Sequence, residues 1–430
     1  MTVKETDIVE DALLQEGLKK YRKLLRRIND EIWEHPEIRF VEHRAHDLLT
    51  KVLEEHQFKV TRNYILETGF RAEFSPESGK YASLGPNVCF ICEYDALPIV
   101  GHACGHNLIA ESGIAMALLT QHVMTECPSR YPGKITVIGS PGEEGGGGKI
   151  IMIEAFNDVD VAMMLHPSNK GILHTESICS SRIFAAYSGK RPEETAHYFP
   201  SLDRMLPGSE SDAAVAAYNA IQVLRAEMPH QWRIGAVIKK IDHSLGLEIT
   251  YRTLHGADMS VLCARIVKCL EAGGAAAGCQ LDWRFTDPYL NMWPNICLGS
   301  TVYSYLKRPE ILFEYGLNKE FNALLSTDMG NVSHLVPSIH PMYYIDTPTS
   351  LHHPDFAKQA NTPEAENRML DCAQAAAHTA LKLLRDPNEL LRVPVRHNGQ
   401  LRRKKRPQKY TLRRIRARGI AQESTHRYNK

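Results

Sequence analysis

Residues 88–107 read VCFICEYDALPIVGHACGHN, an apolar run followed directly by a polar loop that contains glycines. The run at 88–92 has the unbroken apolar character of a strand that is covered on both faces of its sheet. The loop places two imidazoles, a thiol and a carboxylate around small residues, which let the backbone turn and direct several side chains to one point. The stretch therefore predicts a buried strand whose carboxyl end carries a metal site.

Two further apolar runs, at 135–139 and 159–165, have the same texture, and we expect helices between the runs at 107–124 and 148–156. This order is typical of a parallel sheet with helices on its faces, where functional groups gather beyond the carboxyl ends of the strands. Ligand-type residues follow all three runs: Asp95, Cys104, His106, Glu143, Glu144 and His166. Three such strand ends favour one common site over isolated side chains.

The chain of 430 residues is long enough for two domains at the usual ~150 residues each. Around 178–290 the texture changes, with strands expected at 183–187 and 247–252 and long helices at 210–228 and 258–273. This arrangement favours an inserted α+β domain.

Outside the insertion, early helices are expected at 11–34 and 42–56, and a last helix at 363–384. We therefore predict the α/β class. A catalytic α/β/α domain with a mixed, mostly parallel sheet is formed by 1–177 and 291–390, and it is interrupted by a smaller α+β domain at 178–290.

Charge separates the last residues from the rest of the chain. Residues 391–430 hold 14 Lys or Arg and one acidic residue, which leaves 37 basic and 49 acidic residues, a net charge of −12, in 1–390. Such a basic, apolar-poor tail is typical of a disordered arm, which is either a solvated extension with no specific partner or a contact for nucleic acid. No leader-like or membrane-spanning run is present, so we expect a cytoplasmic protein with reduced cysteines and no membrane partner.

The candidate ligands combine soft and hard donors. They are Cys104, His106, Glu144, His166 and His352. Thiolate and imidazole suit zinc, and the carboxylate would also admit manganese or cobalt. Five ligands exceed what one catalytic ion needs, so two divalent ions are the more economical interpretation. Glu143, beside a ligand, is the expected general base.

Several neighbouring residues have competing interpretations. His102 is expected to orient the site rather than bind metal. Cys89 and Cys92 lie three apart on a strand, so they face opposite sides and are expected in the core. The run at 145–149 ends in Lys149 without the Ser or Thr of a phosphate loop, and phosphate binding is rejected. Chemistry alone does not choose between His352 and His353.

Five motifs carry a resemblance to a known family. They are WEHPE (33–37), DALP (95–98), GHACGHN (101–107), GEEGGGGK (142–149) and STDMGNVS (326–333). They resemble the M20 peptidase family of aminoacylase- and carboxypeptidase-type dinuclear metallohydrolases, in its amidohydrolase branch. The resemblance spans residues 10–385. Within this branch, the chain is similar to a subgroup associated with dipeptidase action on β-alanyl-lysine and related dipeptides.

The resemblance implies two metals, zinc or manganese, and a lid domain at 178–290 through which the chain forms a homodimer. It assigns the same five ligands, selects His352 over His353, and makes Glu143 the base. Members carry a Gly-Lys-x-x-His motif in the lid, whereas here Gly189 and Lys190 are separated from His197 by an insertion. His197 is carried over as a catalytic candidate that stabilises the carbonyl oxygen in a partner subunit's site.

The leading hypothesis is therefore hydrolysis of the amide bond of a dipeptide, such as one like β-alanyl-lysine, or of an N-acyl amino acid by a metal-activated water. A second class is a metal-binding or regulatory protein of the same fold whose altered lid has lost turnover. A third, a nucleic-acid-associated factor directed by the basic tail, has no support in the body of the chain.

Overall fold

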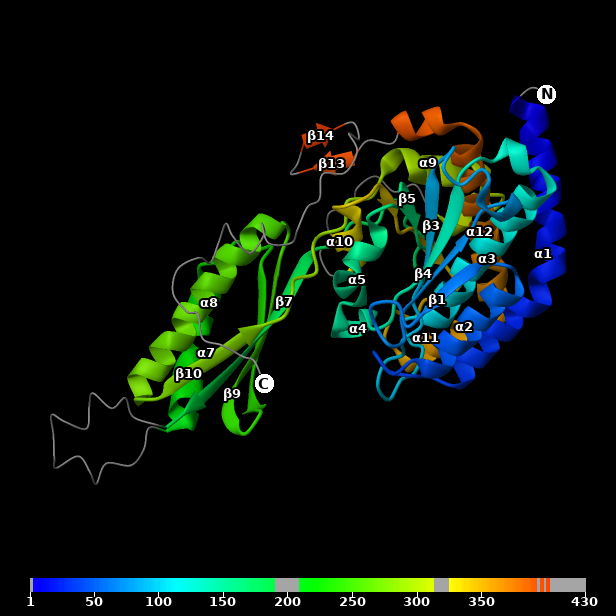
Figure 1. Cartoon of the computed structure of the whole chain (residues 1–430). Helices are drawn as coiled ribbons and strands as arrows, with labels where there is room; N and C mark the ends of the chain where they lie inside the picture. The colour runs from blue at the N-terminus through cyan, green and yellow to red at the C-terminus, as the bar shows by residue number, and fades with distance from the viewer. Residues whose placement is uncertain (1–2, 190–208, 313–324, 393–394, 398–399, 403–430) are drawn as a thin grey trace, which may run out of the picture. The chain divides into compact units, whose positions relative to one another are not determined.

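The computed structural model describes residues 3–189, 209–312, 325–392, 395–397 and 400–402 of the chain (Figure 1). These residues divide into two compact units, which are described separately. Unit 1 contains the described residues of 1–181 and 286–402, and unit 2 contains those of 182–285. The expected domain boundaries at 178 and 290 stay a prediction.

Unit 1 is built on a six-stranded sheet. In spatial order the strands are β1 (Lys59–Arg62), β2 (Phe70–Phe74), β4 (Lys134–Gly139), β3 (Asn87–Cys92), β5 (Val161–Met163) and β11 (Ser338–Ile339). The strands β4, β3, β5 and β11 pair in parallel, whereas β2 pairs antiparallel with both β1 and β4. The predicted α/β class with a mixed, mostly parallel sheet is confirmed.

Strand β3 shows why its sequence is apolar from Val88 to Cys92. All six of its residues are buried, and the five apolar ones alternate between two clusters. Phe90 packs in the cluster beneath the long helices, whereas Cys89 and Ile91 pack in the cluster on the other face. Because both faces of the strand are covered, apolar side chains are favoured on both. Cys89 and Cys92 lie in different clusters, so they are core residues, as predicted.

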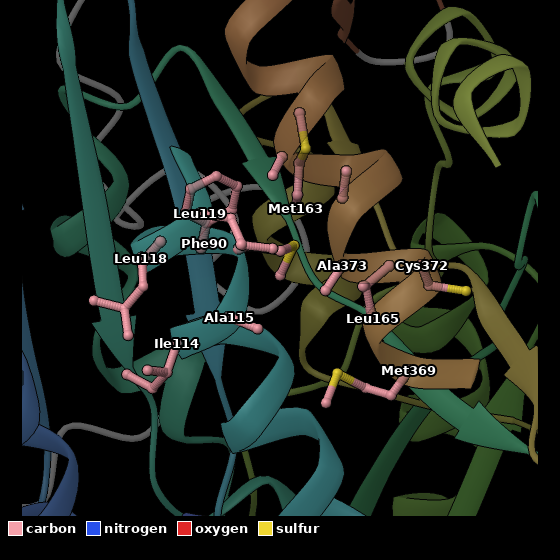
Figure 2. Packing of buried hydrophobic residues seen from close by; sticks show 14 of the residues in the cluster. Phe90, Ile114, Ala115, Leu118, Leu119, Met163, Leu165, Met369, Cys372 and Ala373 are labelled. Carbon is pink, nitrogen blue, oxygen red and sulfur yellow. The ribbon is translucent and has the colours of Figure 1, made fainter. Parts of the chain in front are cut away.

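Helices cover both faces of this sheet. Those of unit 1 are α1 (Val3–Glu34), α2 (His43–Glu55), α3 (His106–Glu126), α4 (Glu143–Gly146), α5 (Gly148–Ile151), α9 (Ile296–Tyr305), α10 (Met329–Ser333), α11 (Pro354–Gln359) and α12 (Pro363–Arg385). Figure 2 shows side chains of α3 and α12 converging on Phe90 and Met163 of the sheet. Helix α12 begins at a Pro that follows the N-cap Thr362, whose hydroxyl accepts a hydrogen bond from the N–H of Ala365 at 3.2 Å.

Two expected elements differ in extent. The strand expected at 159–165 is only three residues long, because β6 (His166–Ser168) pairs with β12 (Met342–Tyr344) in a separate two-stranded sheet. The helix expected at 148–156 is interrupted after Ile151 and continues as a 3-10 turn, η3 (Ile153–Phe156). Strands β13 (Val395–His397) and β14 (Gln400–Arg402) form a short hairpin.

Unit 2 is a four-stranded sheet with two helices. The strands are ordered β10 (Gln280–Phe285), β7 (Cys179–Ser188), β9 (Ser244–Thr253) and β8 (Arg233–Ile241), and the helices are α7 (Glu210–Ala226) and α8 (Gly256–Ala277). Burial alternates strictly along β7, because one face of the sheet is packed and the other is not. The α+β texture expected for this part of the chain is confirmed. Among the residues that the structure describes, no helix has both the length and the apolar character needed to span a bilayer.

Candidate metal centre

The first group of candidate ligands lies where β3 gives way to α3. Gly105 is the N-cap of α3 and has a φ of 78°, and a Cβ there would come within 2.4 Å of the Pro167 ring. Only glycine fits this turn, because it tolerates the left-handed conformation and leaves room for the proline. Cys104 and His106 flank it, and both are buried. The turn therefore brings the thiol and the imidazole to the carboxyl end of the sheet.

The second group follows β4 in the glycine-rich turn α4. Gly142 has a φ of 69°, and a Cβ there would lie 2.6 Å from the ring of Phe40. Hydrogen bonds hold the backbone of the next two residues: Asp95 Oδ2 accepts from the N–H of Glu144 at 2.9 Å, and the Tyr289 hydroxyl donates to the carbonyl of Glu143 at 2.7 Å. The carboxylates of Glu143 and Glu144 therefore extend from a backbone that two hydrogen bonds hold in place.

The five expected metal-binding residues come together. Cys104 Sγ lies 3.6 Å from His166 Nε2, and His352 Nε2 lies 3.3 Å from Glu144 Oε1. Three overlapping groups have all their donor atoms within 4.8 Å of one another: Cys104, His106 and His166; Cys104, Glu144 and His352; and His106, Glu143 and Glu144. Their roles as ligands stay a prediction, but the geometry required for a shared coordination sphere is present.

The tautomer of His106 suits a ligand. Its Nδ1 lies 3.0 Å from Asp95 Oδ1, which accepts the Nδ1 proton. Nε2 is buried and has no hydrogen-bond partner among the described residues, although Glu93 Oε2 lies 3.5 Å away. A carboxylate on one ring nitrogen leaves the lone pair of the other for a metal. Asp95 therefore orients this imidazole and the Glu144 backbone together.

Glu143 has the environment of a proton acceptor. Its side chain is buried, and burial together with the negative charges of Glu93 and Glu144 raises its pKa well above the usual range. A carboxylate with a raised pKa holds a proton more readily near neutral pH, which suits a general base. No hydrogen bond to its carboxylate is found in the described part of the chain, so it is free to approach a substrate or water.

His352 and His353 have different surroundings. His352 has a φ of 69°, and its N–H donates to the carbonyl of Ala103 at 2.8 Å, next to Cys104. A non-glycine residue in this conformation is strained, and such strain is found at functional sites. His353 instead accepts a hydrogen bond from the N–H of Asp355 at 3.2 Å and serves as the N-cap of α11. The local geometry therefore separates the two residues that residue chemistry alone left equivalent.

Of the two other expected site residues, His102 lies apart from these groups and His197 is outside the described residues. His102 is buried, and burial and the charge of His106 lower its pKa to about 3, so its ring stays neutral. It belongs to none of the groups of potential ligands among the described residues. His197 and the insertion before it lie outside the described residues, so its role stays a prediction.

Three residues near the centre were missed at the sequence level. Glu93 directly follows the buried strand β3, which was an available signal. Lys149 was considered only as part of a phosphate loop, yet its side chain is wholly buried. His340 is buried with its ring centroid 5.3 Å from that of His166, and nothing in the sequence around it indicated this position.

Comparisons with known proteins extend over most of the chain. It is 34% identical over 394 residues to the Xaa-Arg dipeptidase of Mus musculus, covering 86% of this chain and 88% of that relative. It is 35% identical over 378 residues to the Xaa-Arg dipeptidase of Homo sapiens, with coverages of 84% and 85%. A p-aminobenzoyl-glutamate hydrolase chain of Escherichia coli is 27% identical, with coverages of 68% and 64%. No protein-family model matches the chain.

Solved structures share the fold. A dinuclear metal-binding peptidase of the M20 family from Bacillus subtilis superposes with a TM-score of 0.56 at 18% identity, over 85% of this chain and 99% of that one. The aminobenzoyl-glutamate utilization protein of Klebsiella pneumoniae gives a TM-score of 0.61 at 16% identity, over 86% and 98%. At these identities the likeness concerns the fold alone.

Proposed function

The chain belongs to the M20 family of metallopeptidases, and we propose that it is a dipeptidase that releases a basic C-terminal residue from a small peptide. The likeness to two relatives named Xaa-Arg dipeptidases supports this substrate class. Dipeptides of the Xaa-Arg type and β-alanyl-lysine belong to it. The observation that carries the proposal is the convergence of five ligand-type side chains beside the carboxylate of Glu143.

The donor set fits a pair of divalent cations. We assign the ligands to Cys104, His106, Glu144, His166 and His352, whose donor atoms fall into overlapping groups. The buried, unpartnered Nε2 of His106 supports the fit, because an imidazole nitrogen without a partner is costly unless a cation takes it up. The sulfur and imidazole donors favour zinc, and manganese or cobalt would also fit. When bound, such a pair of ions polarises the amide carbonyl and makes water more acidic.

The protein side chains then move the proton and hold the geometry. Glu143 accepts a proton from the water that attacks the amide carbonyl and delivers it to the departing amine. Its raised pKa suits both halves of this transfer. Asp95 keeps His106 in one tautomer and fixes the turn that carries Glu143 and Glu144. The hydrogen bond from Tyr289 to the Glu143 carbonyl limits the rotation of that turn.

For the smaller unit we propose the lid and dimerisation role implied by the family, with His197 completing a partner subunit's site. The expected domain at 178–290 lies close to the bounds of unit 2 at 182–285. The basic residues from 403 onward fall outside the described residues, and so do residues 190–208, which include His197 and the insertion before it. Both assignments therefore depend on the family membership and on the sequence.

The test is a substrate panel assayed with the purified, metal-loaded protein. The sharpest pair is alanyl-lysine against alanyl-norleucine, which have the same chain length and differ in the terminal amine. We expect kcat/KM to be highest for peptides ending in Lys or Arg and to fall sharply for norleucine. Faster cleavage of N-acyl amino acids would contradict the substrate class. Bound metal without any hydrolysis would contradict the enzymatic function itself.

A further inference from the structure

Lys149 is a fully buried lysine behind the metal centre. Its ammonium contacts Glu93 Oε1 and lies 2.6 Å from Asp328 Oδ1. Its backbone N–H also donates to Asp328 Oδ2 at 2.8 Å. The tight passage of the chain at Gly148, where a Cβ would come within 1.7 Å of the Pro141 carbonyl, fixes this position. Both ends of the residue are therefore tied to carboxylates from other elements.

The carboxylates around this ammonium form a group that could hold a cation. Glu93, Glu143 and Asp328 are all buried, and each offers an oxygen within 4.8 Å of the others. Three carboxylates at this spacing suit a hard divalent cation such as Mn²⁺ or Mg²⁺. The side chain of Lys149 supplies positive charge to this group from within the protein.

The same group is connected to the proposed metal ligands. Glu93 directs Oε1 to Lys149, and its Oε2 lies 3.5 Å from His106 Nε2. Asp328 directs both of its oxygens to Lys149. Glu143 is the member of the three whose carboxylate has no hydrogen bond in the described part of the chain.

The number of carboxylates near Lys149 exceeds what an ordinary buried ion pair requires. A single carboxylate balances one ammonium, whereas here two carboxylates bind it and a third, that of Glu143, offers an oxygen within 4.8 Å of those two. The excess negative charge would attract a further cation or protons if the ammonium were removed. The lysine thus determines which of the carboxylates remains available.

We propose that Lys149 is a positioning residue whose ammonium takes the place of a third cation. It engages Glu93 and Asp328, limits the centre to two metal ions, and leaves Glu143 as the free carboxylate that moves the proton. The inference rests on the proposed two-metal function, because the number of bound ions is the quantity that it sets.

The direct test counts metal ions in the Lys149→Ala variant. The variant removes the charge and leaves space among the three carboxylates. Wild-type and variant are dialysed against Mn²⁺ and analysed by elemental analysis and electron paramagnetic resonance. We expect two ions per chain in the wild-type and three in the variant, with activity inhibited by excess Mn²⁺ in the variant only. Two ions in the folded variant with an unchanged kcat would overturn the proposal.

A matched control is Lys134→Ala. Lys134 also bridges two carboxylates, Glu73 and Asp158, but it is partly exposed and belongs to another cluster. It should keep two ions, so a third ion there would show that any lost lysine recruits metal and would contradict a specific role for Lys149. The double variant of Glu93→Gln with Lys149→Ala should return to two ions, because one of the three carboxylates is gone.

A milder substitution at the same position serves as the control for misfolding. Lys149→Gln keeps N–H donors for the same carboxylates without the charge, and circular dichroism and the thermal midpoint report whether it folds. It should also bind a third ion, more weakly than Lys149→Ala. If only the charge-balanced pair of Glu93→Gln with Lys149→Gln folds and keeps two ions, charge compensation is supported. A wild-type protein without metal would instead refute the proposed function, which separates the two failures.

Discussion

Two partly buried groups that contain carboxylates and histidine lie in unit 1, and they differ in the source of their positive charge. One is the proposed metal centre. The other joins α1 to α12 and consists of Asp7, Glu10 and His378, whose donor atoms also lie within 4.8 Å of one another. In this second group His378 Nε2 lies 3.0 Å from Glu10 Oε2, and the Tyr131 hydroxyl donates to Glu10 Oε1 at 2.7 Å.

The difference is the source of positive charge. The guanidinium of Arg385 contacts Glu10 and lies 3.1 Å from Asp7, so the second group already contains its cation. At the proposed centre, the ion pair found for the Glu144 carboxylate in the described part of the chain is with His352 rather than with a guanidinium or an ammonium, and Cys104 lies against His166. Residue types therefore do not identify a metal site on their own. The source of positive charge beside the carboxylates separates the two groups, and the following predictions test that distinction.

The largest expected effect is on turnover in Glu143→Gln. The substitution keeps the size of the side chain and removes the base, so kcat should fall by about 10²–10⁴-fold. Metal content should remain that of the wild-type, since Glu143 is not among the assigned ligands. Steady-state kinetics and elemental analysis measure both quantities. Activity close to that of the wild-type would refute the role of Glu143.

Arg385→Met should lower the free energy of unfolding and leave the metal content unchanged. Removing one partner of a buried ion pair leaves an uncompensated charge, and the free energy of unfolding should fall by about 3–5 kcal/mol. Urea unfolding gives this value, and the metal content of the folded fraction should not change. If the variant instead took up an additional ion with no loss of stability, the second group would be a cation site after all.

Cys104→Ala should weaken metal binding. We expect a loss of affinity above the ~10–100-fold that is typical for removal of an outer partner of a metal ligand. Competition with a chelator measures the change. Cys92→Ala is the control, because this thiol is buried in β3 and should leave the affinity unchanged. Equal metal affinity in the two variants would exclude Cys104 as a ligand.

The smallest expected effect is a pH dependence of stability from Glu10. Burial alone would raise its pKa, but hydrogen bonds with His378 and Tyr131 and the charge of Arg385 hold it below the ordinary value of 4.5. Its contribution is therefore fully present above pH 4.5 and is lost as the pH falls through the lower folded-state pKa. Wild-type should lose more stability than Glu10→Gln between neutral pH and the acid range below 4.5. Parallel unfolding curves at both pH values would contradict this.

Much of the fold could be predicted because burial leaves a pattern. The strands at 88–92 and 135–139 are apolar throughout or nearly so, and both lie within the central sheet. The strands β1 and β2 were not predicted, since they are short and partly exposed. The expected strand at 159–165 proved shorter because His166 pairs with a different partner strand, which depends on a segment far away in the chain.

For the candidate site, the residues that follow the strand ends could be named from the order of the chain alone. The order of the chain and the glycines at Gly105 and Gly142 require turns there, and Cys104, His106 and Glu144 come with those turns. This is local information, because each ligand is close to the turn that positions it.

The charged partners of the carboxylates, both behind the site and in the second group, depend on long-range packing. Lys149 meets Asp328 across 179 residues of sequence, and Arg385 meets Glu10 across 375, so neither pairing leaves a periodicity. Whether a buried carboxylate faces a metal, an ammonium or a guanidinium depends on which distant element packs against it. That pairing is set by the packing of the whole unit, so no local pattern contains it.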